Sequence, residues 1–137
     1  MMTILADAGP LVAFLNHRDS QHDWAAKMLR HLPPRLVTCE AVLSEAFHLL
    51  ENTSQGCPKL LELLERGVVV SQFNLAEELP AVSGLMRRYA DVPMSLADAC
   101  LVRMAELSED AAVFTTDGDF RHYRRHRRAA IPLLFPG

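Results

Sequence analysis

Four acidic side chains occupy the positions of this sequence that are best suited to chemistry. Asp7 and Asp117 each follow a short apolar run that is typical of a buried strand. Asp98 lies in the first turn of an expected helix, and Glu45 lies at the border of an apolar helical stripe. Ligands of open α/β sheets bind outside the carboxyl ends of the strands. We therefore expect these carboxylates to face one another across such a crevice.

Carboxylates that converge in one crevice favour a bound cation. Like charges brought together repel and raise each other's pKa unless a cation compensates them. A ligand set made only of oxygen atoms, with no matching His or Cys, favours Mg²⁺ or Mn²⁺ over zinc. Ions of this kind polarise a phosphodiester and activate a water molecule. The residue types thus predict metal-assisted hydrolysis.

Each acid also has a structural interpretation. An aspartate at the end of a strand is a common helix cap. Ser95-x-x-Asp98 fits the capping box, although a carboxylate in the first turn also projects from the end of the helix, so both interpretations are compatible. A side chain in the position of Glu45 can simply reach water. Glu40, which suits the positive end of a helix dipole, is predicted to be purely structural.

Short apolar strands alternate with helical patterns along the chain, and this alternation predicts the α/β fold class. The pattern favours a central parallel sheet of four to five short strands with helices on both faces. Asp19 or Ser20 is expected to cap the second helix, and Pro80 is expected in the first turn of the fifth. The predicted strands are 3–6, 36–38, 68–70, 111–115 and a short edge strand at 131–134. The predicted helices are 11–15, 20–31, 39–51, 58–66, 75–90 and 95–107.

Length and composition predict an ordinary globular protein. The 137 residues suffice for one compact domain, which we expect to span 1–137. Half of the residues are apolar and 23% are charged. Three widely spaced cysteines without a CxxC pair predict free thiols rather than a zinc site. The sequence shows no signal-peptide pattern and no long apolar run, so we expect a cytoplasmic protein without a membrane span.

Four stretches of the sequence together resemble the PIN domain family, and more narrowly the small prokaryotic PIN proteins that are similar to VapC toxins. They are LADAGPLVA at 5–13, TCEAVLSE at 38–45, MSLADA at 94–99 and TTDGDF at 115–120. Each stretch is weak by itself. Their order, and the acid that each of them contains, carry the resemblance over most of the chain.

The resemblance implies a three-layer PIN-like fold and a ribonuclease that depends on Mg²⁺ or Mn²⁺. It further implies an RNA substrate, a small antitoxin as partner if the chain is a toxin, and a homodimer. Thr115 corresponds to an auxiliary hydroxyl residue, and Asp119 resembles an additional acid at the metal site. The catalytic metal-site acids would be Asp7, Glu45, Asp98 and Asp117.

The chain departs from the resemblance directly after Asp7. Many relatives carry Ser or Thr there, whereas this chain has Ala8 and Gly9, so a hydroxyl ligand is missing. Two alternatives follow. One is a PIN-like module that binds RNA or protein without cutting it. The other is a phosphatase with an aspartyl-phosphate intermediate, which is disfavoured because such enzymes resemble one another in a second Asp at the position of Gly9.

A basic stretch follows the last acids. Residues 1–119 carry nine basic and 17 acidic residues, a net charge of −8, whereas 120–137 carry five arginines and no acid. We expect these arginines to bind RNA phosphates and Tyr123 to stack on a base. Antitoxin docking, or a solvated turn or helix end, is the alternative. Trp24 and Met28 are expected in the core or at a dimer face. The arginines are Arg121, Arg124, Arg125, Arg127 and Arg128.

Overall fold

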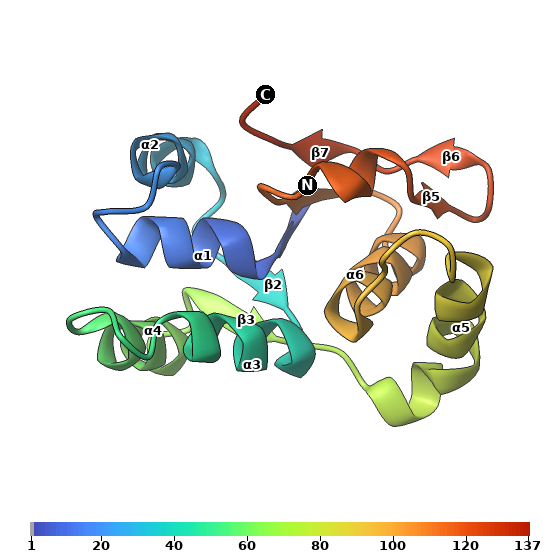
Figure 1. The fold of residues 1–137 in the computed structure, drawn as a ribbon, viewed down its shortest axis with the longest axis horizontal. Coiled ribbons are helices and arrows are strands. Elements are labelled where there is room, and N and C mark those ends of the chain that lie inside the picture. Colours follow the sequence, from blue (N-terminus) through green and yellow to red (C-terminus); the bar gives the residue numbers. More distant parts are fainter. Residues whose placement is uncertain (1) are drawn as a thin grey trace.

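A five-stranded, all-parallel sheet forms the centre of the computed structural model, which describes residues 2–137 (Figure 1). The strand order is β3-β2-β1-β4-β7, so the chain first builds one half of the sheet and then crosses β1 to build the other. The strands are β1 (Thr3–Ala6), β2 (Leu36–Thr38), β3 (Val69–Ser71), β4 (Ala111–Phe114) and β7 (Leu133–Leu134). The predicted α/β class and parallel sheet are confirmed.

Helices cover both faces of the sheet. They are α1 (Ala8–Leu15), α2 (His22–His31), α3 (Glu40–Leu49), α4 (Gly56–Glu65), α5 (Leu75–Arg88) and α6 (Leu96–Leu107). Figure 1 shows α1, α2 and α4 on one side of the strands, with α5 and α6 on the other. Pairs of these helices connect β1 to β2, β2 to β3 and β3 to β4, because parallel strands need long connections, whereas a short 3-10 helix (Gly118–Arg121) and a small hairpin connect β4 to β7. The apolar side of each α-helix closes the core.

Buried residues of the strands and of the helices together form one hydrophobic core. Phe114 of β4 packs against Trp24 of α2, with ring centroids 5.3 Å apart, which places Trp24 against the core as predicted. All three cysteines are free, as predicted. None of the helices that the structure describes is both long and apolar enough to cross a membrane.

Two local predictions were wrong. Gln21, rather than Asp19 or Ser20, precedes α2, and it makes no side-chain cap; the Asp19 carboxylate instead accepts a hydrogen bond from Gln21 N at 2.8 Å. Pro80 is the sixth residue of α5 and not part of its first turn, because Asn74 caps the helix. Proline there removes one helical hydrogen bond, a cost that the packing of α5 against α6 tolerates.

A small antiparallel hairpin was not predicted. It joins β5 (Arg124–Arg125) to β6 (Ala129–Ala130) and contains most of the basic stretch. Arg128 N donates to Arg125 O, and the two residues between them have positive φ, 50° at His126 and 68° at Arg127. Such turns normally carry Asn or Gly, and neither residue type is present here to indicate a turn.

Candidate active site

Asp7 is placed by β1 and held rigidly. Its backbone N donates to Phe114 O of the neighbouring β4 at 2.9 Å, which fixes it at the carboxyl end of both strands. Its Oδ1 accepts from Ala8 N at 2.8 Å and thereby caps α1. The side chain is only 6% exposed. Asp7 therefore caps α1 and also lies at the carboxyl ends of the strands.

A chain of hydrogen bonds links Asp7 to the acids that follow β4. The Thr115 hydroxyl donates to Asp7 Oδ2 at 2.7 Å and accepts from Asp117 N at 2.9 Å. Asp117 Oδ1 in turn accepts from Asp119 N at 2.9 Å. Thr115 is fully buried, so this hydroxyl has one fixed orientation. It ties the loop with Asp117 and Asp119 to the carboxylate of Asp7.

Asp98 closes the site from α6. Ser95 and Asp98 form the predicted capping box: Asp98 N donates to Ser95 Oγ at 3.0 Å, and Ser95 N donates to Asp98 Oδ2 at 3.1 Å. Tyr123 OH also lies 3.3 Å from Asp98 Oδ2 and 3.2 Å from Pro93 O. Asp98 is 8% exposed. These contacts hold a buried carboxylate at the beginning of the helix.

The electrostatics show that the acids share one region. Burial raises the pKa of Asp7 to about 6, against the opposing hydrogen bonds from Thr115 and Ala8, and the charges of Asp98 and Glu45 add to the rise. Burial also raises the pKa of Asp98, to which the charge of Asp117 contributes. Partial burial also raises the pKa of Glu45, which projects from α3, and the charges of Asp98 and Asp117 raise it further. The four predicted acids are therefore brought together at one edge of the sheet.

The donor set suits a hard divalent cation, although no three His, Cys, Asp or Glu side chains within residues 2–137 already stand in a ligating arrangement. Asp98 uses Oδ2 and Asp117 uses Oδ1 in the hydrogen bonds of the described chain, which leaves one oxygen of each available. Glu45 is exposed and free to turn. All of these donors are oxygen atoms that repel one another, and a cation would relieve that repulsion.

A hydroxyl group reaches the position where the sequence lacks one. A Cβ atom added at Gly9 would collide with the Thr116 hydroxyl, so the glycine permits β4 to bring this side chain against the first turn of α1. Residues 8 and 9 carry no hydroxyl, but the hydroxyl of Thr116 lies beside them. No local pattern predicts this contact, because only the pairing of β1 with β4 brings the two positions together.

Of the arginines predicted to bind RNA, some lie near the acids and others lie at the far end of α6. Arg121 lies near the acids, because its guanidinium is 3.0 Å from the place that a Cβ would take at Gly118, between Asp117 and Asp119. The same guanidinium lies 4.9 Å from the ring centroid of Phe135. Arg124 bonds to the carbonyl of Arg121 at 2.8 Å, and Arg125 bonds to Ser108 O at 2.8 Å, at the end of α6 that is opposite to Asp98. The latter side chain anchors the hairpin and is not beside the carboxylates.

One of the predicted contacts was wrong. Tyr123 cannot stack on a base, because it is fully buried and packs edge-on against Phe120 and Tyr89, with both pairs of ring centroids 5.2 Å apart. Burial, and then the neighbouring charge of Asp98, raises the pKa of its hydroxyl. Tyr123 is therefore a neutral hydrogen-bond donor beneath the site.

The parallel sheet and the acids at the carboxyl ends of its strands define an α/β domain with a candidate metal site at that edge. Residues 4–126 match the PIN domain family, and the chain belongs to it. Among solved structures, the chain is similar to Mycobacterium tuberculosis VapC20, described as a toxin that cleaves the sarcin–ricin loop. The two share 21% identity over 85% of this chain and 92% of that one, with a TM-score of 0.77, which confirms the PIN-like fold. No curated protein matches the chain in sequence.

Proposed function

We propose that the protein is a divalent-metal-dependent ribonuclease and the toxin of a toxin–antitoxin pair. The observation that carries the proposal is the gathering of Asp7, Glu45, Asp98 and Asp117 at one edge of a PIN domain, where burial and the neighbouring acidic charges raise the pKa of Asp7, Glu45 and Asp98. An RNA substrate, a small antitoxin and a homodimer belong to the same proposal. The VapC20 likeness supports it through a relative that cleaves RNA.

The residues of the chain divide the work. Asp98 and Asp117 each offer a free carboxylate oxygen to Mg²⁺ or Mn²⁺, Glu45 can turn toward it, and Asp119 extends the set. Asp7 supplies a buried negative charge whose orientation Thr115 fixes. When bound, the cation supplies charge stabilisation at the phosphodiester and activates a water molecule.

Metal removal is the direct test of this function. Purified protein should cleave single-stranded RNA with Mg²⁺ or Mn²⁺ and stop when EDTA is added, because no cation then stabilises the negative charge that develops on the oxygens of the phosphodiester. Readdition of either ion should restore cleavage. RNA that stays bound but intact under every metal condition would instead identify a PIN-like binding module without catalytic activity.

Thr115 offers a finer test of the hydrogen-bond chain. Thr115→Val keeps the shape but removes the hydroxyl between Asp7 and Asp117, so we expect cleavage to fall by about 10–100-fold, as for other outer-shell partners of metal ligands. Thr115→Ser keeps the hydroxyl and should recover most of the rate. Equal rates for the Val and Ser variants would show that the hydroxyl has no positioning effect.

A further inference from the structure

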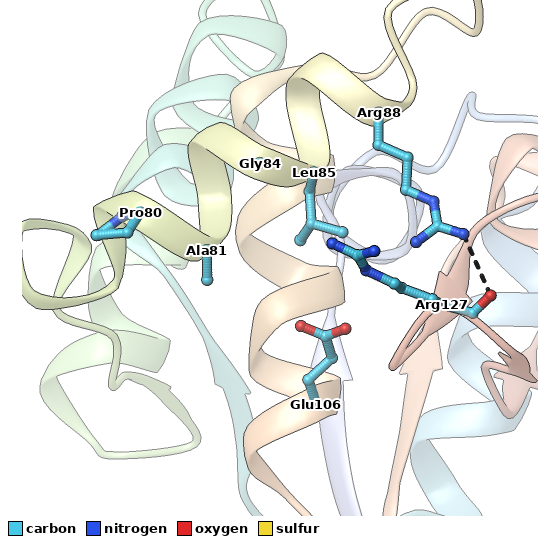
Figure 2. Close-up of a pocket in the computed structure, with 7 residues that line it drawn as sticks. All are labelled: Pro80, Ala81, Gly84, Leu85, Arg88, Glu106 and Arg127. Atoms are coloured by element: carbon cyan, nitrogen blue, oxygen red, sulfur yellow. Dashed lines mark hydrogen bonds between the residues drawn. The ribbon is translucent and has the colours of Figure 1, made fainter.

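A hollow lies away from the acids, between α5, the last turns of α6 and the β5–β6 hairpin (Figure 2). Its volume is about 410 Å³. Leu85 and Pro80 of α5 give it an apolar wall, while Arg88, Arg127 and Glu106 surround it with charge. The proposed catalytic site uses none of these α5 and α6 residues.

The hollow has an excess of positive charge. In Figure 2 the guanidinium of Arg127 points into it, and none of the hydrogen bonds or ion pairs of residues 2–137 engages that group. Glu106 is already occupied: its Oε2 accepts from His126 N at 2.7 Å and its Oε1 accepts from Arg103 at 3.3 Å. The one acid of the hollow therefore leaves Arg127 uncompensated.

The backbone places Arg127 at a conformational cost. His126 and Arg127 have φ values of 50° and 68°, in the left-handed region that residues other than glycine rarely adopt, and arginine is not among the residue types enriched there. Two contacts hold the turn in this form: Glu106 binds His126 N, and Arg88 Nη2 donates to Arg127 O at 3.3 Å. Strain that the surroundings maintain so fully is typical of functional positions.

The shape of the hollow indicates the chemistry of its ligand. Gly84 lies in its wall, and a Cβ there would meet no described atom within 4 Å, so the space beside α5 is open. Leu85 and Pro80 offer an apolar surface directly beside the arginines. An anion with a flat apolar body, such as a nucleotide with its phosphate and base, matches both halves.

One basic segment of the chain runs from the proposed active site to the hollow. The segment after Asp117 follows α6 from its first turn, where Tyr123 meets Asp98, to its last turn, where His126 meets Glu106. This distance is about 12 Å, given eight residues of helix between Asp98 and Glu106. The rest of the chain has a net charge of −8, so a polyanion can approach most favourably along this basic segment.

We propose that this hollow is a secondary RNA-binding subsite, in which Arg127 and Arg88 hold a phosphate of the substrate chain and the wall at Leu85 receives a base. The inference rests on the proposed ribonuclease function and names a second contact with the same substrate. An acidic peptide is the competing occupant, and the experiment separates the two.

Arg127→Gly removes the guanidinium and also relieves the backbone strain, because glycine adopts positive φ freely. We expect a melting temperature equal to or above that of the wild type, together with weaker binding of RNA of about 12 nucleotides in EDTA. One lost phosphate contact should flatten the slope of log K against log salt by about 0.7. Lys27→Ala, which removes an exposed charge on α2, is the control and should change neither quantity.

A matched pair at Gly84 tests the hollow itself. Gly84→Glu offers a carboxylate to the arginines, whereas Gly84→Gln has the same shape without the charge, and both favour the helix. The Glu variant should bind the longer RNA about tenfold more weakly than the Gln variant, the loss expected for one charge-assisted contact. Equal binding by the two variants would overturn the proposal. The proposal would also be overturned if the Glu variant bound polyglutamate more weakly than the Gln variant while both bound RNA equally well. That result would assign the hollow to an acidic peptide. Because binding is measured in EDTA, a protein that cleaves no RNA would contradict the ribonuclease proposal but leave this test intact.

Discussion

Asp7→Asn is expected to reduce RNA cleavage by at least about 100-fold, because loss of an outer-shell partner already costs 10–100-fold and Asp7 lies in the site itself. The variant should still fold. Asparagine is as good a helix cap as aspartate, and its carbonyl oxygen can accept from Ala8 N as Asp7 Oδ1 does. The change removes a charge from the site and leaves the shape of the side chain unaltered.

The measurement is the rate of cleavage of single-stranded RNA with saturating Mn²⁺, together with the circular dichroism of the same preparation. Glu40→Gln is the matched control: Glu40 is an exposed acid in the first turn of α3, predicted to be structural, and the chemical change is the same. It should cleave at the wild-type rate. A folded Asp7→Asn protein with wild-type activity would remove Asp7 from the proposed mechanism.

The positions of Asp7 and Asp98 could be predicted because local patterns determine them. A short apolar run before Asp7 predicts a strand end, and Ser95-x-x-Asp98 predicts a helix start. The resemblance of four short stretches then indicated that these local positions belong to one site. The order of the sheet supplies the physical link, since β1 lies directly beside β4 and thus brings Asp7 to the residues that follow Phe114.

The region after Asp119 could not be predicted, because tertiary contacts determine its conformation. Nothing in the local sequence of His126 and Arg127 favours positive φ, which contacts with Glu106 and Arg88 impose from two helices. Tyr123 is an aromatic residue in a basic stretch, which favours base stacking, yet its hydroxyl donates a hydrogen bond to the buried carboxylate of Asp98. A charge count could not tell an arginine that anchors the hairpin from one that faces a ligand.

The Thr116 hydroxyl beside Gly9 shows the same limit of local patterns in the site itself. A comparison of residues 7–9 with the family pattern indicates a missing hydroxyl, whereas the fold brings one to that place from the loop after β4. The absent side chain at Gly9 is what makes the approach possible. In this chain the hydroxyl that the motif lacks after Asp7 is thus replaced by the hydroxyl of Thr116, which comes from a distant segment of the sequence.

The metal-free protein is expected to become more stable as the pH falls from about 7 toward 4. Burial raises the pKa of Asp7 from 3.8 to about 6 in the folded state. A carboxyl group whose folded pKa is raised contributes stability that is complete below the unfolded pKa and is lost as the pH rises through the folded pKa. At 1.36 kcal/mol for each pKa unit, the contribution of Asp7 is as much as about 3 kcal/mol. Asp98 and Glu45 act in the same direction.

Chemical denaturation in EDTA at several pH values between 4 and 7.5 measures this effect. Asp7→Asn has no proton to gain at this position, so its free energy of unfolding should depend much less on pH, and it should exceed that of the wild type at pH 7.5. Excess Mg²⁺ should stabilise the wild type at pH 7.5 by about 2.7 kcal/mol at 100 times its dissociation constant. That stabilisation should decline toward pH 5, because a cation competes with protons for carboxylates. Parallel pH profiles for the two proteins in EDTA would show that Asp7 carries its charge without cost, and the repulsion that favours a cation at this site would then be absent.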